Sequence, residues 1–170
     1  MKAIHFFKTM VIILIGVAGS GKTTVGRIMA ARLGCEFHDA DDLHSPQNRE
    51  KMSRGIALSD EDRLPWLHAV RDLVQQCVLE NRDAVIACSA LKQSYRDLLV
   101  VDAAKVKLVY LKGSRALIAE RLARRAGHFF DQRLLQSQFD TLEEPADAVV
   151  VDISETPERI ADAIRARLNL

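Results

Sequence analysis

The sequence predicts an α/β fold: one parallel sheet of five strands with helices covering both of its faces. Two observations predict it. Short, continuous apolar runs alternate along the chain with longer segments of helical periodicity. The apolar runs lack polar alternation, which is typical of parallel strands buried on both faces. No linker, repeat or low-complexity segment interrupts the 170 residues, so we expect a single domain over 1–170.

The first half of the chain is expected to hold two strands and three helices. The strands are 10–15 and 35–38, and the helices are 22–33, 46–54 and 59–80. Gly34 is expected to end the first helix, and Ser59 to cap the third through a side-chain capping box. Pro65 fits only the first turn of a helix, which leaves the start of the third one open.

The second half is expected to hold three strands and three helices. The strands are 84–88, 106–111 and 148–152, and the helices are about 114–125, 132–139 and 156–168. Ser114 is the expected N-cap of the first of these helices, and Pro157 opens the last one. A glycine and two aromatic residues around Gly127 separate the first two helices.

A phosphate-binding loop lies between the first strand and the first helix. Residues 16–23 read GVAGSGKT, the pattern G-x-x-x-x-G-K-[ST] in its strand–turn–helix context. Backbone N–H groups of such a P-loop surround phosphate oxygens, and the helix N-terminus adds a favourable dipole. We therefore expect ATP to bind the loop residues Gly16, Val17, Ala18, Gly19, Ser20, Gly21, Lys22, Thr23 and Thr24. Lys22 would reach the β- and γ-phosphates, and the Thr23 hydroxyl would hold Mg²⁺.

Composition argues against several classes of function. The formal net charge of +1 gives no basic excess for nucleic acid and no polybasic tail for a membrane surface. The longest apolar run is too short to span a bilayer. Three cysteines without a CxxC pair indicate reduced thiols in a cytoplasmic protein, and Cys88 is expected to pack in the sheet. Residues 1–9 are expected to be a solvated N-terminal extension, so the true start could be Met1 or Met10.

Polar residues follow the second strand, at the edge where parallel sheets bind ligands. Asp39, Asp41 and His44 stand there. Transfer of a phosphoryl group to a hydroxyl requires one carboxylate to orient or accept the hydroxyl proton and another to help place the metal. An acidic turn that merely caps the next helix would look similar. No aspartate ends the strand 84–88, where P-loop proteins often keep a magnesium carboxylate, so Asp39 or a water network must supply it.

Two clusters of basic residues are candidates for binding anions. Arg121 and Arg125 lie one helical turn apart before the glycine–aromatic break, which suggests a mobile lid at 121–138 that brings arginines onto the phosphate. A solvated charged face is the simpler alternative. The second cluster suits an anionic substrate, although about half of it is expected to be ordinary surface charge. It comprises Arg49, Lys51, Arg54, Arg63, Lys92 and Arg96. Trp66, the only tryptophan, is expected in the core.

Several longer segments of the chain are distinctive. They are 39–44 (DADDLH), Asn48, Lys51-Met52, 58–67 (LSDEDRLPWL), 88–92 (CSALK), 95–97 (YRD), 125–129 (RAGHF), 137–139 (SQF), Leu142-Glu143 and Pro145. In these segments the sequence resembles the gluconate kinases. The resemblance covers nearly the whole chain from Val11 to Asp152, and the DR-PWL, CSALK-YRD and GHF-SQF segments are its most specific parts. Ala40 departs from the family, which usually has glycine between the two aspartates.

The resemblance implies ATP-dependent phosphorylation of D-gluconate at its 6-hydroxyl, a step in carbohydrate acid metabolism. It also implies a fold like the nucleoside monophosphate kinases, with a helical lid, and a homodimer. The roles would be Lys22, Asp41, Arg121 and Arg125 in catalysis and Thr23 and Asp39 at the metal. Asp41, His44, Arg49, Lys92 and Arg96 would bind gluconate.

Two other functions stay open at this point. The first is another small P-loop kinase, of the shikimate or nucleoside monophosphate type, which a panel of substrates would distinguish. The second is a nucleotide-controlled switch or motor that hydrolyses its nucleotide. A GTPase switch would need N-K-x-D and D-x-x-G segments, and neither occurs in this sequence.

Overall fold

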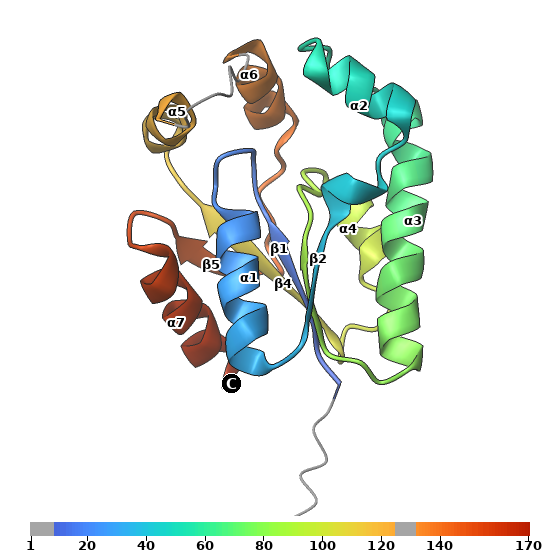
Figure 1. The fold of residues 1–170 in the computed structure, drawn as a ribbon, viewed down its shortest axis with the longest axis vertical. Helices are drawn as coiled ribbons and strands as arrows, with labels where there is room; N and C mark the ends of the chain where they lie inside the picture. The colour runs from blue at the N-terminus through green and yellow to red at the C-terminus, as the bar shows by residue number, and fades with distance from the viewer. Residues whose placement is uncertain (1–8, 125–131) are drawn as a thin grey trace, which may run out of the picture.

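The structure, a computed structural model, describes residues 9–124 and 132–170. Its sheet has five parallel strands in the order β2-β3-β1-β4-β5 (Figure 1). The strands are β1 (Val11–Ile15), β2 (Glu36–Asp39), β3 (Ala84–Ala87), β4 (Val106–Lys112) and β5 (Val149–Asp152). The predicted five-stranded parallel sheet is therefore confirmed, with each strand within one residue of its expected ends.

Helices cover both faces of the sheet (Figure 1). On one face α1 (Lys22–Leu33) packs against α7 (Pro157–Leu168), and on the other α3 (Asp60–Leu79) packs against α4 (Gln93–Leu99). The central strand β1 serves both cores, since Ile13 belongs to the cluster under α3 and Leu14 to the cluster under α1. All five residues of β1 are buried, which explains the lack of polar alternation in its sequence.

The ends of α1 and α3 follow the local chemistry of the sequence. Gly34 ends α1 in the left-handed conformation, with φ of 66°. Ser59 caps α3 through the full capping box with Asp62. Pro65 lies inside α3, beyond the first turn to which it was expected to be limited. Because the ring removes only the bond to the carbonyl of the exposed Glu61, water can satisfy that group and the helix continues.

The remaining elements follow the carboxyl ends of β2, β3 and β4 (Figure 1). A 3₁₀ turn, η1 (Ala40–Leu43), leads from β2 to α2 (Pro46–Ser53), while α5 (Arg115–Ala123) and α6 (Gln132–Thr141) follow β4. Helix α4 was not expected from the sequence. Its seven residues are too few to show a clear helical period. No helix in the described ranges is long and apolar enough to cross a membrane.

Thr9 belongs to the packed structure. This residue was assigned to the solvated extension, but it is buried and its hydroxyl donates a hydrogen bond to Asn81 at 3.1 Å. Residues 1–8, the rest of that expected extension, lie outside the described residues.

Candidate active site

The phosphate loop has the conformation that its glycines predict. Gly16, Gly19 and Gly21 all have positive φ, and Gly21 is the N-cap of α1. A Cβ on Gly19 would lie 2.8 Å from the Leu122 side chain, so the loop packs directly against α5. The glycines therefore serve both the turn and the close contact with the neighbouring helix.

Lys22 is folded back onto its own loop. Its Nζ donates to the carbonyls of Gly16 and Val17, at 2.9 Å in each case. Lys22 also lines the main cavity. Its ammonium group is thus already at the loop, where a phosphate oxygen could replace a carbonyl as its acceptor.

Thr23 and Asp39 lie together although they come from different elements. The Thr23 hydroxyl donates to Asp39 Oδ2 at 2.7 Å, and Asp39 Oδ1 accepts from the Asp41 backbone N–H at 3.1 Å. Mg²⁺ prefers oxygen ligands and usually takes one or two from protein, with phosphates and waters completing the octahedron. No group of three potential metal-binding side chains is found among residues 9–124 and 132–170. The Thr23–Asp39 pair therefore fits a magnesium ion that is shared with phosphate.

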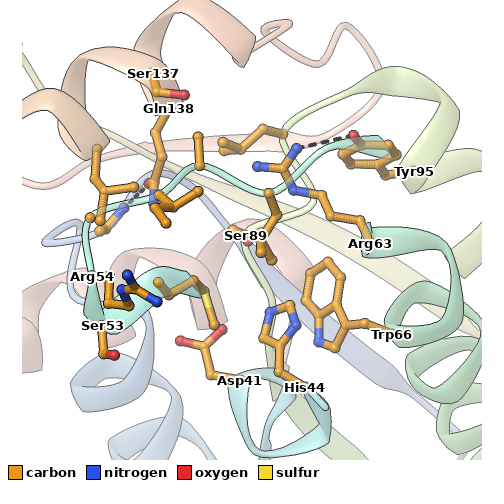
Figure 2. Close-up of a pocket in the computed structure, with 18 of the residues that line it drawn as sticks. Asp41, His44, Ser53, Arg54, Arg63, Trp66, Ser89, Tyr95, Ser137 and Gln138 are labelled. Atoms are coloured by element: carbon orange, nitrogen blue, oxygen red, sulfur yellow. Dashed lines mark hydrogen bonds between the residues drawn. The ribbon is translucent and has the colours of Figure 1, made fainter. Parts of the chain in front are cut away.

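A cavity of about 620 Å³ opens beside the phosphate loop (Figure 2). It is lined from the phosphate loop, α1, η1, α2, α3, α4 and α6, and by the segments that follow η1, α2 and β3. Its polar and charged lining residues are Lys22, Asp41, His44, Ser53, Arg54, Arg63, Ser89, Tyr95, Ser137 and Gln138. The cavity thus combines the phosphate loop with the acidic turn after β2, as expected for the carboxyl edge of a parallel sheet.

Asp41 presents its carboxylate to this cavity (Figure 2). The surrounding protein raises the pKa of Asp41 above its usual value, while the charge of Lys22 acts in the opposite direction. The side chain itself is accessible through the cavity. A carboxylate with a raised pKa that a ligand can reach is suited to accepting a proton.

His44 lies flat against Trp66 at the cavity wall. Their ring centroids are 4.3 Å apart with an interplanar angle of 12°, and Trp66 Nε1 donates to the Ala40 carbonyl at 2.7 Å. Burial and the nearby charges of Arg63 and Arg49 lower the pKa of His44 to about 4. His44 is therefore neutral near pH 7. Trp66 is buried, as expected, and also lines the cavity.

Arg63 is the cation that α3 places in the cavity wall (Figure 2). Its side chain is 17% exposed, and Nη1 lies 3.5 Å from the Tyr95 hydroxyl and 4.0 Å from Asp60 Oδ1. Tyr95 itself donates to Asp60, which also accepts from Lys92. Asp60 is thus held mainly by Tyr95 and Lys92, and the Arg63 guanidinium has room for another anionic partner.

Three residues that were expected to bind the substrate, Arg96, Lys92 and Arg49, contact other parts of the protein. Arg96 is buried and donates to the carbonyls of Ala90, Leu91 and Glu143, and burial lowers its pKa. Lys92 forms a surface ion pair with Asp60 at 2.7 Å.

Arg49 is the third of these residues. It donates to the carbonyls of Asp42 and His44 and thereby fixes the turn that carries Asp41. The cavity is not lined by Arg49, Lys92 or Arg96. A single sequence does not reveal that backbone carbonyls surround the Arg96 side chain.

The residues of the expected lid are described only in part. Arg121 donates to the Ile153 carbonyl, and its Nη1 is 3.8 Å from where a Cβ on Gly21 would lie, so it does approach the phosphate loop. Arg125 and the glycine–aromatic break lie outside the described residues. Cys88 is buried as expected, and burial together with the charge of Asp41 raises its pKa to about 12.

Sequence reasoning singled out neither Ser89 nor Gln138 as a site residue. It placed Arg63 in a cluster of six cations but preferred Arg49, Lys92 and Arg96 as substrate ligands. Both omitted residues occur in the segments that resemble the gluconate kinases, CSALK and SQF. The signal for Arg63 was its spacing of three residues from Trp66, because positions i and i+3 share one face of a helix.

Comparison with known protein families gives a match over most of the chain. The family model described as shikimate kinase matches residues 18–169. The thermosensitive gluconokinase of Escherichia coli (strain K12) is 45% identical over 157 residues, covering 90% of this chain and 84% of that protein. A probable gluconokinase of Mus musculus is 44% identical over 153 residues, covering 80% of this chain and 83% of its own length.

Solved structures agree with these relatives. A gluconokinase from Sinorhizobium meliloti superposes with a TM-score of 0.84 and is 41% identical, covering 95% of this chain and 94% of its own. An unliganded sugar kinase from Janibacter has a TM-score of 0.87 at 40% identity and covers 95% of both chains. A shikimate kinase from Aquifex aeolicus, 17% identical with a TM-score of 0.62, shares the fold.

Proposed function

We propose, since this chain belongs to the gluconokinase family, that it phosphorylates D-gluconate at the 6-hydroxyl with ATP, giving 6-phospho-D-gluconate and ADP. The relatives named gluconokinase support this reaction at 44–45% identity over most of the chain. The chain also belongs to the family that the shikimate kinase model describes. The observation that carries the proposal is one cavity that is lined by Lys22, by Asp41 and by Arg63.

The roles follow from where these groups lie. Asp41 orients the 6-hydroxyl and accepts its proton as the hydroxyl oxygen attacks the γ-phosphorus of ATP. The bond from that phosphorus to the β–γ bridging oxygen breaks, and ADP leaves. Lys22 neutralises charge on the transferring group. Thr23 and Asp39 would hold Mg²⁺, which would supply positive charge to the phosphates. Arg121 and Arg125 are proposed to bind the transferring phosphate from a lid at 121–138.

Arg63 is the proposed partner of the gluconate carboxylate. It lines the same cavity as Asp41, and its guanidinium matches a carboxylate in shape and charge. The neutral His44 and the Ser89 hydroxyl would bind hydroxyls along the open chain. Arg63 replaces Arg49, Lys92 and Arg96, whose side chains are held elsewhere.

A substrate panel tests the reaction. ADP release would be coupled to a spectroscopic signal with gluconate, glucose, shikimate and a nucleoside monophosphate as acceptors. Gluconate and glucose share a primary hydroxyl on C6, but only gluconate is open-chain with a carboxylate. A site built around a polar partner commonly rejects an analogue lacking it by about 10⁴ in kcat/KM. Equal rates on the two sugars, a preference for shikimate, or ADP release that no acceptor stimulates would refute the proposal.

Two further features are proposed from the family resemblance. The chain is proposed to form a homodimer, which light scattering on the purified protein tests. It is also proposed to act in the cytoplasm.

A further inference from the structure

Gln138 connects helix α6 to the phosphate loop. Its Oε1 accepts a hydrogen bond from the Ala18 backbone N–H at 2.6 Å (Figure 2). Phosphate loops use backbone N–H groups to bind phosphate oxygens, so a side chain that is bonded to a loop N–H lies beside the place where phosphate would bind. Gln138 and Ala18 both line the cavity that contains Lys22 and Asp41.

The orientation of the Gln138 amide follows from this contact. A backbone N–H can only donate, so the amide oxygen must face Ala18 and the Nε2 group must lie on the other branch. Nε2 carries two hydrogens, and within the described parts of the chain it donates to no acceptor. The side chain therefore brings two unused donors to the cavity.

Gln138 is the last residue of the proposed lid at 121–138, and α6 is anchored on either side of it. Leu135, one turn before it, is buried in the core. Two residues after the end of α6, the Glu143 N–H donates to the Leu91 carbonyl at 2.9 Å, and the Glu143 carbonyl accepts from the buried Arg96 at 2.8 Å. A donor held by packing and hydrogen bonds on both sides is preorganised, which is the property that stabilises charge in a transition state.

We propose that Gln138 is a further catalytic residue, which holds the Ala18 amide through Oε1 and donates through Nε2 to an oxygen of the transferring phosphoryl group. The inference rests on the proposed function. It assigns to α6 a direct role in phosphoryl transfer, in the cavity that Lys22 and Asp41 also line.

Two substitutions separate the two halves of the amide. Gln138→Met removes both the acceptor and the donors, whereas Gln138→Glu keeps an acceptor for Ala18 but replaces the donors with negative charge. Gln136→Met and Gln136→Glu are matched controls, because Gln136 lies on the same helix, bonds to Asp140 and does not line the cavity.

The first measurement is hydrogen–deuterium exchange of the loop 16–21 in the protein without nucleotide. Gln138→Met should speed exchange of the Ala18 amide, while Gln138→Glu and both Gln136 variants should leave it slow. The second is kcat with saturating ATP and gluconate. Loss of one preorganised donor typically lowers kcat by about 10²–10³-fold. Gln138→Met should show that loss with KM for gluconate within about threefold, and Gln138→Glu should be slower still because its charge repels the phosphoryl oxygens.

Background ATP hydrolysis without an acceptor is measured in every variant, since it also requires phosphoryl transfer. A wild-type protein that ignores gluconate would refute the proposed function, yet slower hydrolysis in Gln138→Met would still support the role of Gln138. The inference is overturned if kcat and hydrolysis stay within twofold of the Gln136 controls. An effect confined to KM for gluconate would likewise overturn it, by assigning Nε2 to the acceptor.

Discussion

Replacing Arg63 with Met should weaken gluconate binding selectively. The change keeps an unbranched side chain that can pack near the Tyr95 ring and removes only the guanidinium. Arg63 approaches Tyr95 at 3.5 Å and Asp60 at 4.0 Å, so neither is a tight ionic partner to be left uncompensated. Hydrogen bonds to charged groups contribute about 1.5–3 kcal/mol, which corresponds to about a 10- to 150-fold rise in KM for gluconate.

Steady-state kinetics on gluconate and glucose would measure this effect. KM for glucose should hardly change in Arg63→Met, since glucose has no carboxylate, and kcat on gluconate should fall much less than kcat/KM. Arg71→Met is the control, because Arg71 lies two turns further along α3 and lines a separate groove. A KM for gluconate within threefold of the wild type, or an equal rise for both sugars, would remove Arg63 from the carboxylate site.

Three further changes have defined outcomes. Asp41→Asn should lower kcat by about 10²–10⁴-fold with little effect on ATP binding, and it should abolish the acid limb of the kcat/KM profile, which the raised pKa of Asp41 moves to higher pH. The pKa of His44 is lowered to about 4, so between pH 6.5 and 4 His44 is protonated in the unfolded chain but not in the folded one. The free energy of unfolding should therefore fall as the pH drops from 6.5 to 4. Chemical denaturation of His44→Gln should show a shallower decline over that range, and an unchanged slope would assign the decline to other groups. Arg96→Met should lower the free energy of unfolding by about 1–3 kcal/mol or more, because buried carbonyls lose their donor. The surface change Lys92→Met should cost less than about 1 kcal/mol, and equal losses would contradict the structural role of Arg96.

The sheet could be predicted from the sequence because its signals are local. Buried parallel strands give continuous apolar runs, and Gly34, Ser59 and Pro157 mark helix ends through their own backbone chemistry. Helix α4 escaped detection because its seven residues lack a clear period. Its place is fixed by tertiary packing, which no local pattern reports.

The sequence could predict a residue of the candidate site where a reactive residue type directly follows a predicted strand. The loop lysine Lys22 and the acidic turn of Asp41 are of this kind, because both follow a strand at the same edge of the sheet. The cations could not be sorted in this way. Arg63 and Arg96 carry the same guanidinium, and only packing in three dimensions sends one to a cavity and the other among backbone carbonyls.

The place of β1 in the middle of the sheet has a consequence for synthesis. This strand leaves the ribosome well before its two neighbours, β3 and β4, which end only at Ala87 and Lys112. The backbone groups of its apolar sequence VIILI therefore stay unpaired on both edges while more than half of the chain is synthesised. Such a segment pairs readily with other unfinished chains, so slow translation or crowded polysomes should favour aggregation. Chaperones that shield the nascent N-terminal segment should raise the yield of folded kinase more than they affect its final stability.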